Sequence, residues 1–443
     1  MCPSRNGDEP AEGNPVDSET RSVASSNLQE AAMPATAPRE APGPPLPEGL
    51  FEMDGLLWLS HCVDGPMPSA VAEPLVRMVR KEICPWNMDW ESDFLATQKN
   101  LRAACARLVN GVPEDISLSP CTSTGIQTVA QGFPWREGDE VLLPMGEFPA
   151  NAMPWEALRS RGVTCRAIPL WKGQKAGGEA LETLPPALGQ RSFEQALQDA
   201  IGPRTRMIAV SWVRFQDGLM LDLESLGRLC QRAGVPLVVD AIQGMGTFQP
   251  DLRGVSALAT GGHKGLLGPQ GQGFLWSRAS FRAELAPTGT WLSMGAAFSQ
   301  EGTQGAAMAT WAEDGRKLEP GSPSILGSAA LLASLEVLRV PGIPAIQQHV
   351  IGLQTRLLDA LHHHPLWRPE AERLLALRRH DRLGAILSFH HSAVGMARLK
   401  NHLVEGTHRR IRSSIREGYL RLAFHGWHAE QDLERVVDWM TSF

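Results

Sequence analysis

Residues 221–241 read LDLESLGRLCQRAGVPLVVDA, and this stretch decides the fold class. Leucines and a cysteine recur at helical spacing over 223–230, Asp222 suits an N-cap, and Gly234 suits a C-cap. A continuous apolar run, VPLVV, follows at once and ends at Asp240. Runs of this type form strands that are buried on both faces of a parallel sheet. The stretch therefore predicts a helix that leads into a central parallel strand.

Strand and helix patterns alternate on both sides of this stretch. A helix is expected over residues 154–161. Short β-rich runs that predict strands occupy residues 140–143, 164–170, 207–212, 257–260 and 273–276. This alternation predicts an α/β domain with a mostly parallel sheet.

The pattern changes near residue 324. Two long helical patterns cover 325–338 and 346–361, and a strand pattern and further helices follow at 386–391, 397–405 and 429–440. We therefore expect a large domain with an N-terminal arm over 50–323 and a smaller α+β domain over 324–443.

Residues 1–49 differ from the rest of the chain in composition. They are rich in Pro, Ala, Ser and Glu and include the run APGPPLP, which is typical of disordered chain. They contain acidic residues and no apolar run like that of a signal peptide. No window of the chain has the roughly 18 uninterrupted apolar residues that a membrane helix needs. We expect a cytoplasmic protein that has no membrane partner.

Charge and cysteine content exclude further classes of protein. The 443 residues carry a formal net charge of −6, which argues against nucleic-acid binding, because such binding depends on an excess of Lys and Arg. The 7 cysteines are scattered without a CxxC pair. They are expected to be mostly buried free thiols in a reducing compartment. None lies beyond Cys230.

Two common phosphate-binding motifs are absent from the chain, and two other motifs can be interpreted in two ways. GxxxxGK[ST] is absent, and no GxGxxG follows a strand and opens a helix. HHH at 362–364 offers metal ligands, although a histidine cluster before a proline is more typical of a surface loop. The basic run from His408 to Arg416 could contact phosphates or form a solvated strand and turn.

Residues 261–273, GGHKGLLGPQGQG, place six glycines around His263 and Lys264. Glycine lets a backbone come close to a ligand. Asp240 and Lys264 each follow a predicted strand, and ligands of open α/β sheets bind beyond the carboxyl ends of strands. A lysine amine with a lowered pKa can form a Schiff base, and a carboxylate can pair with a cationic ring nitrogen. Pyridoxal 5'-phosphate (PLP) requires both groups of its protein.

Residues 121–127, CTSTGIQ, supply candidate phosphate donors. Thr122 and Ser123 stand at the expected N-terminus of a helix, where backbone N–H groups favour anions. Gln243 lies three residues after Asp240 and can donate a hydrogen bond.

Four motifs, DAIQ, GGHKGLLG, EPGSPSILG and IREGYLRLAFH, occur in this order along the chain. With the segment around them, the chain resembles the class V aminotransferase family from about Phe51 to the C-terminus. This family includes cysteine desulfurases, selenocysteine lyases and isopenicillin N epimerase-like enzymes. The resemblance implies the PLP-dependent transferase fold type I, PLP as cofactor, an amino acid as small-molecule substrate, and a homodimer with a shared active site.

The resemblance also implies roles for individual residues. Lys264 matches the Schiff-base lysine and general base, and Arg421 matches the arginine that binds the substrate carboxylate. Ser322, in EPGSPS, matches a phosphate ligand that the second subunit contributes. The other cofactor contacts are the ring-nitrogen partner Asp240, the ring-hydroxyl partner Gln243, and the phosphate ligands Thr122, Ser123 and His263.

Three departures from the family pattern bear on the reaction. Phe148 stands where many members stack a histidine on the cofactor ring, and a phenyl ring can stack but cannot relay a proton. Trp212 stands where many relatives have an asparagine. Residues 231–443 contain no cysteine, although a desulfurase carries its persulfide cysteine on a loop in that region. A persulfide mechanism of that kind is not expected.

The reaction type is open because the fold does not decide it. We expect an aminotransferase. One alternative is a C–S or C–Se lyase that has no persulfide cysteine. A second is an amino-acid epimerase, although no second acid is evident. A third is a non-catalytic PLP-fold binding protein, which is disfavoured because Lys264 and Asp240 are both present.

Overall fold

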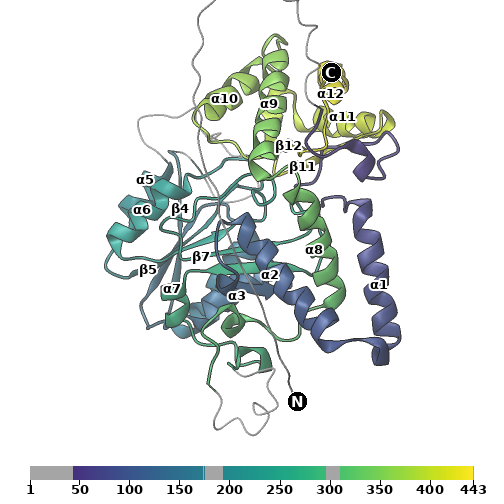
Figure 1. Ribbon diagram of the computed structural model, residues 1–443. Coiled ribbons are helices and arrows are strands. Elements are labelled where there is room, and N and C mark those ends of the chain that lie inside the picture. Colours follow the sequence, from purple (N-terminus) through teal and green to yellow (C-terminus); the bar gives the residue numbers. More distant parts are fainter. Residues whose placement is uncertain (1–42, 173, 175–192, 296–309, 443) are drawn as a thin grey trace, which may run out of the picture. The chain divides into compact units, whose positions relative to one another are not determined.

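The computed structural model describes residues 43–172, 174, 193–295 and 310–442 (Figure 1). Most of the tail expected over 1–49 lies outside these residues. Leu46 is buried, and its N–H donates to the Gly426 carbonyl at 2.9 Å. The packed chain therefore begins ahead of the boundary expected at residue 50.

A seven-stranded sheet with the order β2-β8-β7-β6-β5-β3-β4 forms the centre of the fold. All its neighbouring strands run parallel except β8, which is antiparallel to both β7 and β2. The prediction of a mostly parallel sheet is therefore confirmed. The strands are β2 (Ile116–Ser119), β3 (Glu140–Pro144), β4 (Thr164–Ile168), β5 (Thr205–Ser211), β6 (Leu237–Asp240), β7 (Ala257–Gly261) and β8 (Gly273–Ser277).

The two faces of this sheet are covered by two separate sets of helices. Successive strand residues point to opposite faces. Accordingly, Val238 packs in a core with α3, α4 and α7, whereas Val239 packs in a core with α2, α5, α6 and α8. The helices are α2 (Ala96–Leu108), α3 (Thr122–Gly132), α4 (Pro149–Glu156), α5 (Phe193–Ala200), α6 (Leu223–Ala233), α7 (Ala279–Glu284) and α8 (Ile325–Arg339).

Helix α6 forms as predicted, whereas α4 begins earlier than expected. The Asp222 side chain accepts a hydrogen bond from the Ser225 N–H at 3.0 Å, and Gly234 ends α6 with a φ of 65°. The helix expected over 154–161 starts at Pro149 and continues as a 3₁₀ turn through Arg161. Proline is well accommodated in a first turn, where its missing N–H would have no helical partner.

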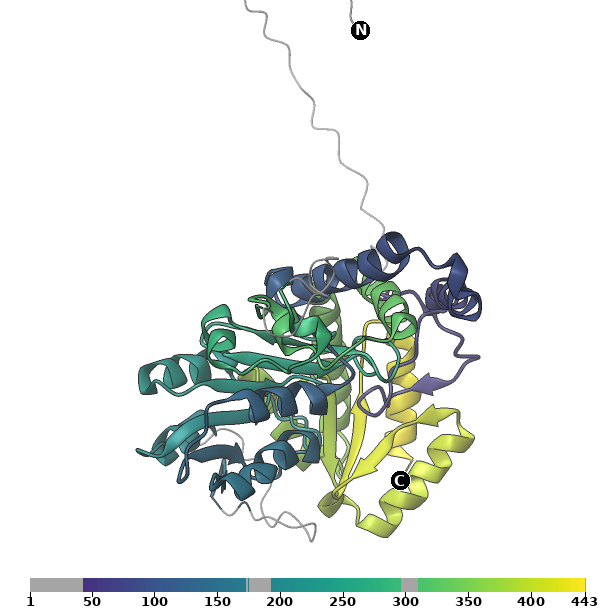
Figure 2. The same ribbon diagram turned by 90° about the horizontal axis from the view of Figure 1, so that it is seen from below.

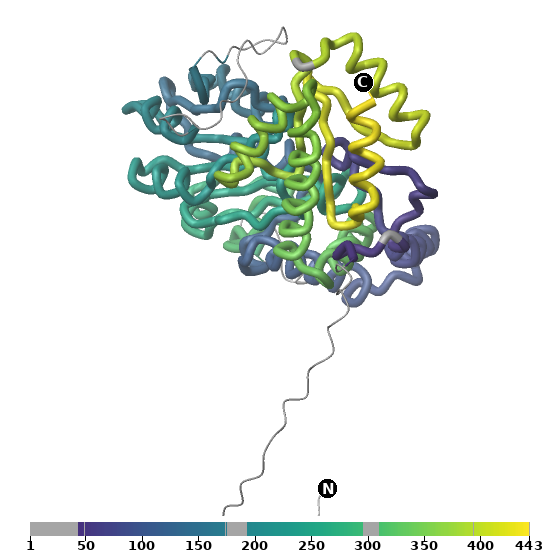
Figure 3. Tube along the Cα trace, turned by 90° about the horizontal axis from the view of Figure 1, so that it is seen from above, coloured from purple at the N-terminus to yellow at the C-terminus, as the bar shows by residue number. Residues whose placement is uncertain are grey.

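The C-terminal residues form a smaller α+β layer, which Figures 1 and 3 show in green and yellow beside the teal sheet region. Its antiparallel sheet has the order β11-β12-β9. Gly43–Phe443 form one compact unit by their contacts. The boundary between two domains at residue 323 therefore stays a prediction. The elements are α9 (Ile343–His362), α10 (Arg368–Arg379), β9 (Ile386–His390), α11 (Met396–His408), β11 (Ser414–Arg416), β12 (Tyr419–Ala423) and α12 (Glu430–Thr441).

The N-terminal arm joins this C-terminal region to the central sheet. Strand β1 (Leu57–Trp58) pairs in parallel with β10 (Ile411–Arg412), and Figure 2 shows β1 in purple beside the yellow strands. The Gly65 N–H donates to the His263 carbonyl at 2.7 Å. A Cβ atom on Gly65 would lie 2.1 Å from the Lys264 carbonyl oxygen, so only glycine fits here. The arm then continues into α1 (Ala72–Ile83), which packs on α8.

Within the described ranges, no single helix has both the length and the apolarity needed to cross a membrane. Helices α8 and α9 meet this criterion only as a pair, which is bent by 70° at the break between them.

Candidate active site

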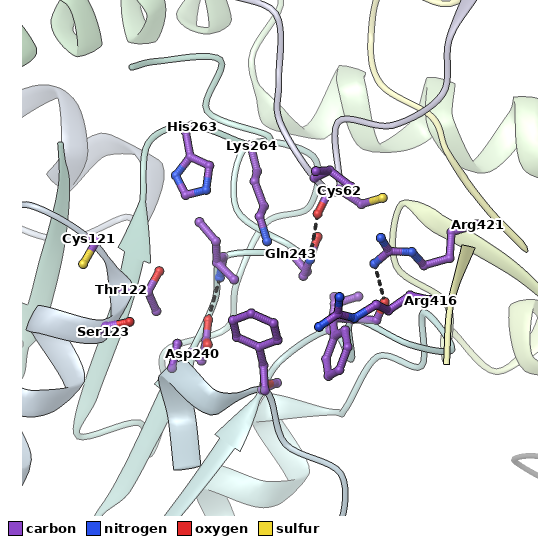
Figure 4. A pocket seen from close by; sticks show the side chains of 17 residues that line it. Cys62, Cys121, Thr122, Ser123, Asp240, Gln243, His263, Lys264, Arg416 and Arg421 are labelled. Carbon is purple, nitrogen blue, oxygen red and sulfur yellow. Dashed lines mark hydrogen bonds between the residues drawn. The ribbon is translucent and has the colours of Figure 1, made fainter. Parts of the chain in front are cut away.

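A cavity of about 350 Å³ lies where β2, β5, β6 and β7 end (Figure 4). Parallel strands present their carboxyl ends at one edge of a sheet, which is where ligands of such sheets bind. The cavity brings together every predicted site residue except Ser322: Thr122, Ser123, Phe148, Asp240, Gln243, His263, Lys264 and Arg421.

Asp240 is buried and has a free acceptor. Its Oδ1 atom accepts the Ile242 N–H at 3.0 Å, whereas its buried Oδ2 atom has no partner among the described residues. Burial, together with the nearby Glu147 carboxyl, raises the pKa of Asp240 to about 7. A cationic ring nitrogen beside Oδ2 would supply both the missing hydrogen bond and the compensating charge. Asp240 therefore fits the pyridinium nitrogen of PLP.

Lys264 follows β7 in the same cavity, and its amine is largely removed from water. Burial lowers the pKa of Lys264, although the Asp240 charge opposes this effect. An amine with a lowered pKa is more often neutral near pH 7, and the neutral amine is the form that reacts with a carbonyl carbon. Lys264 therefore suits both covalent attachment of PLP and proton transfer.

One end of the cavity, here called the cofactor end, is lined by Thr122, Ser123 and His263. Thr122 and Ser123 occupy the first turn of α3, whose N–H groups and positive dipole favour an anion. Burial and the nearby Lys264 lower the pKa of His263. Neutral donors and a helix N-terminus fit a phosphate group. The chain's residues thus fit both the ring and the phosphate of PLP.

Gln243 and Phe148 also line the cavity. The Gln243 Nε2 atom donates to the Cys62 carbonyl at 3.0 Å. Phe148 is 36% exposed and meets Phe215 edge to face, with ring centroids 5.0 Å apart. Trp212, by contrast, is buried outside the cavity lining, and its ring packs against Gly244.

The opposite end of the cavity, here called the arginine end, contains Arg421 on β12. The Arg421 Nη1 atom donates to the Phe215 carbonyl at 2.8 Å, and Nε donates to Ser414 Oγ at 3.2 Å. No acidic side chain of the described ranges forms an ion pair with this buried arginine. Its position across the cavity from Thr122 and Ser123 suits a substrate carboxylate (Figure 4).

Four further residues line the cavity that the sequence does not predict there: Arg416, Cys62, Cys121 and Phe215. Arg416 belongs to the predicted basic run, but the β11–β12 pairing turns it toward the cavity. Cys62 arrives from the N-terminal arm, and its Sγ atom lies 3.9 Å from Ser414 Oγ. Only tertiary contacts bring the arm to this site, so no local pattern signals it.

Ser322 does not line the cavity of its own chain. It is exposed, and its Oγ atom accepts the Trp291 Nε1–H at 3.1 Å. Its assignment to a partner's phosphate site stays a prediction. In the part of the chain that the structure describes, no three His, Cys, Asp or Glu side chains are grouped to hold a metal, and this covers HHH at 362–364.

A half-buried lysine with a lowered pKa, an aspartate with a free acceptor and a helix N-terminus at one sheet edge define a PLP-dependent enzyme of fold type I. The chain belongs to the aminotransferase class-V family, whose model matches residues 88–408. Its cofactor is accordingly PLP.

Curated relatives carry two kinds of name. A "probable cysteine desulfurase" of Methanothermobacter thermautotrophicus is 31% identical over 273 residues, which are 59% of this chain and 61% of that protein. An "uncharacterized aminotransferase" of Bacillus subtilis is 26% identical over 381 residues, or 84% of this chain and 90% of that protein.

Solved structures share the fold. The complex of the cystine C–S lyase C-DES with cysteine persulfide matches with a TM-score of 0.72 and 23% identity, over 88% of this chain and 100% of that one. The cysteine desulfurase CsdA of Escherichia coli matches with a TM-score of 0.69 and 20% identity, over 88% and 96% of the two chains.

Proposed function

We propose that this chain is a PLP-dependent C–S lyase that acts on an L-amino acid with sulfur at Cβ. The observation that carries the proposal is one cavity in which Lys264, with its lowered pKa, lies between the unpartnered Asp240 oxygen and Arg421. Carbon–sulfur cleavage, among the reactions of this family, is supported by two similarities. One is to relatives named cysteine desulfurase, and the other is to the solved structure of a cystine C–S lyase. They support this alternative better than the expected transamination.

Each residue has a defined task in this reaction. Arg421 binds the substrate carboxylate with two parallel N–H donors and thereby sets the direction in which Cα points. Lys264, as the neutral amine, takes the Cα proton. Asp240 would hold the cofactor through its ring nitrogen and keep a proton there, and Phe148 would offer an apolar surface to the ring. When bound, PLP supplies the ring that accepts the electron pair left at Cα.

The overall change balances without an external oxidant. The Cα–H and Cβ–S bonds break, and the electron pair of the Cβ–S bond leaves with sulfur as a thiol or persulfide. Water then releases the remaining three-carbon fragment as pyruvate and ammonia. No protein cysteine is required, which agrees with the absence of cysteine from residues 231–443.

Transamination is the second candidate function. It is favoured by the Bacillus subtilis relative named an uncharacterized aminotransferase, whose match covers more of both chains than the desulfurase match does. Its final proton transfer differs from that of a lyase, but both reactions begin with the same Lys264 and Arg421 contacts.

A spectral and product assay separates the two candidates. The purified holoenzyme receives L-cysteine or an S-substituted L-cysteine with no keto acid present. Continuous release of pyruvate and ammonia, with the visible absorption band of the cofactor retained, is expected for the lyase. If the band bleaches once, in proportion to the enzyme, and product formation stops, the enzyme is an aminotransferase and the lyase proposal is wrong.

We propose further that the chain forms a cytoplasmic homodimer in which Ser322 reaches the partner's phosphate site. Large apolar side chains stand exposed on and just after α1, and Trp291, which donates to Ser322, is also exposed. A second copy of the chain would cover them: Val76, Ile83, Trp86 and Trp291. Light scattering should give a dimer mass for the wild type and a monomer mass for Trp86→Glu. A monomeric wild type at micromolar concentration would contradict the proposal.

A further inference from the structure

Two guanidinium groups enter the arginine end of the cavity. Arg421 is buried at the base of this end, and Arg416 is exposed at its mouth. Figure 4 shows both side chains on the side of the cavity that lies away from Thr122 and Ser123. One α-carboxylate occupies one arginine, so the second guanidinium requires a separate explanation.

The hairpin formed by β11 and β12 fixes this pair. Ser414 lies opposite Arg421 in the antiparallel register, and Arg416 is two residues along the same strand. Residues two apart share a face of a strand, so Arg416 and Arg421 are diagonal neighbours on one face. Glu417 and Gly418 connect the strands with φ values of 46° and 83°, which suits a tight two-residue turn. The register, and with it the arginine pair, is therefore set by the backbone.

The positive charge of this pair is not balanced by the protein. Arg421 donates to the neutral oxygens of Phe215 and Ser414. Arg416 lies over the Phe215 ring, with its Cζ atom 5.8 Å from the ring centroid. Neither arginine forms an ion pair with an acid in the described residues, and this includes Glu417 beside Arg416. Like charges on one strand face are unfavourable, and an anion between them would reverse the effect.

We infer that Arg416 recognises a second carboxylate at the far end of the substrate side chain. The inference rests on the proposed C–S lyase function and names its substrate class: L-amino acids whose Cβ-linked sulfur chain ends in a carboxylate. L-Cystine is one member of this class. Arg421 binds the carboxylate next to the reacting Cα, and Arg416 binds the carboxylate of the distal half.

The reaction of L-cystine balances as follows. One Cα–H bond and the adjacent Cβ–S bond break, and the sulfur–sulfur bond stays intact in the leaving group. With one water, L-cystine gives pyruvate, ammonia and cysteine persulfide. The leaving persulfide keeps the distal carboxylate, so Arg416 contacts the group that departs.

The test compares L-cystine with the mixed disulfide of L-cysteine and cysteamine, which differs from it only by the missing distal carboxylate. Pyruvate formation gives kcat/KM for each, and titration of the visible absorption band of the holoenzyme gives Kd. Wild type is expected to prefer L-cystine by about 10–100-fold in both quantities, the usual value of a hydrogen bond between charged groups. Arg416→Gln should abolish the preference, and Arg416→Lys should restore part of it.

Arg412→Gln is the matched control. Arg412 lies on β10, outside the cavity lining, where its Nη1 atom donates to Thr407 Oγ1 at 2.7 Å. This variant loses the same charge and should keep the full preference for L-cystine. Equal loss in both variants would assign the effect to net charge and overturn the inference.

The remaining outcomes separate this inference from the proposed function. If wild type uses both disulfides equally well, the C–S lyase function stands and the role of Arg416 is wrong. If neither disulfide yields pyruvate, the lyase function is wrong. In that case a Kd preference for L-cystine that Arg416→Gln removes still supports carboxylate recognition, whereas equal Kd values overturn it.

Discussion

Toward the cofactor end of the cavity, Asp240 is the last residue of β6, and Thr122 and Lys264 each follow a strand of the central sheet by three residues. At the arginine end, Cys62, Phe215 and Arg421 come from the N-terminal arm, the β5–α6 loop and the C-terminal layer. Strand ends of one sheet are fixed together by its hydrogen bonding, whereas the arginine end is assembled from three segments that lie far apart in the sequence. The comparison suggests that cofactor binding is the constant part of the site and that the arginine end determines which substrate reacts.

Lys264→Ala tests the cofactor end most severely. The variant should lose the visible absorption band, and its rate of pyruvate formation should fall by at least about 10³-fold. Both covalent attachment of PLP and proton transfer use this amine. Spectrophotometry and a coupled pyruvate assay measure the two losses, with thermal unfolding as the check on folding. A folded variant that keeps an unchanged band would contradict the role of Lys264.

Arg421→Gln should weaken substrate binding at the arginine end and leave cofactor binding unchanged. The expected change is a loss of about 10²-fold in kcat/KM, because the α-carboxylate loses a paired charge and two N–H donors. The visible spectrum of the resting enzyme should stay as in wild type. Steady-state kinetics on L-cystine give the loss, and a changed resting spectrum would show that the two ends are not separable.

Asp240→Asn should alter how stability of the apoprotein depends on pH. In the folded state the pKa of Asp240 is about 7, above its ordinary value of 3.8. The folded state therefore binds the extra proton between these values, and this contribution to the free energy of unfolding is lost as pH rises toward 7. Asparagine cannot ionise and does not lose this contribution. At pH 8 the free energy of unfolding of the apo-variant should therefore be higher than that of the apo-wild type by roughly 1–3 kcal/mol.

Urea unfolding of both apoproteins at pH 5 and pH 8 measures this difference. Buried His61, His425 and His428, whose pKa values are lowered by burial, also titrate, but they are common to both proteins and cancel. An equal difference at the two pH values would contradict the raised pKa of Asp240. With PLP bound, the order should reverse, because the variant lacks the charge that pairs with the ring nitrogen.

Cys62→Ser should have the smallest effect. The thiol lines the arginine end, but elimination of a persulfide from L-cystine needs no sulfur acceptor on the protein. Pyruvate formation is expected to stay within about threefold of wild type, as for a change without a lost charge or cavity. A loss above tenfold, with a persulfide detected on Cys62 of the wild type by mass spectrometry, would make this cysteine part of the chemistry.

The same contrast explains what the sequence predicts. The sequence places Asp240, Lys264, Thr122 and Ser123 near one another because they adjoin elements whose periodicity is strong, and the structure finds all four in the cavity lining. Arg416 is not predicted, since its direction depends on the register of β11 against β12. Cys62 is not predicted because the family resemblance places a reactive cysteine within residues 231–443, whereas the arm reaches the cavity from the other end of the chain.

Two glycines of residues 261–273 have a purpose that the sequence does not predict. A Cβ atom on Gly265 would lie 2.3 Å from the Met245 carbonyl oxygen, and one on Gly273 would lie 2.2 Å from that of Thr260. The close approach is thus between neighbouring backbone segments of the protein. Composition alone cannot distinguish a backbone that packs on a ligand from one that packs on another backbone.

The pairing of β1 with β10 has a consequence for synthesis of the protein. Leu57 pairs with Ile411, and Ser60 pairs with Ala423. The arm can therefore pack over the Lys264 loop only after these later residues have been synthesised. At about 5–20 residues per second, a ribosome needs roughly 20–70 s between these positions. During that interval the seven-stranded sheet can form while the arginine end of the cavity is still missing. A nascent chain stalled before residue 411 should therefore expose Lys264 to reagents from which the finished protein shields it.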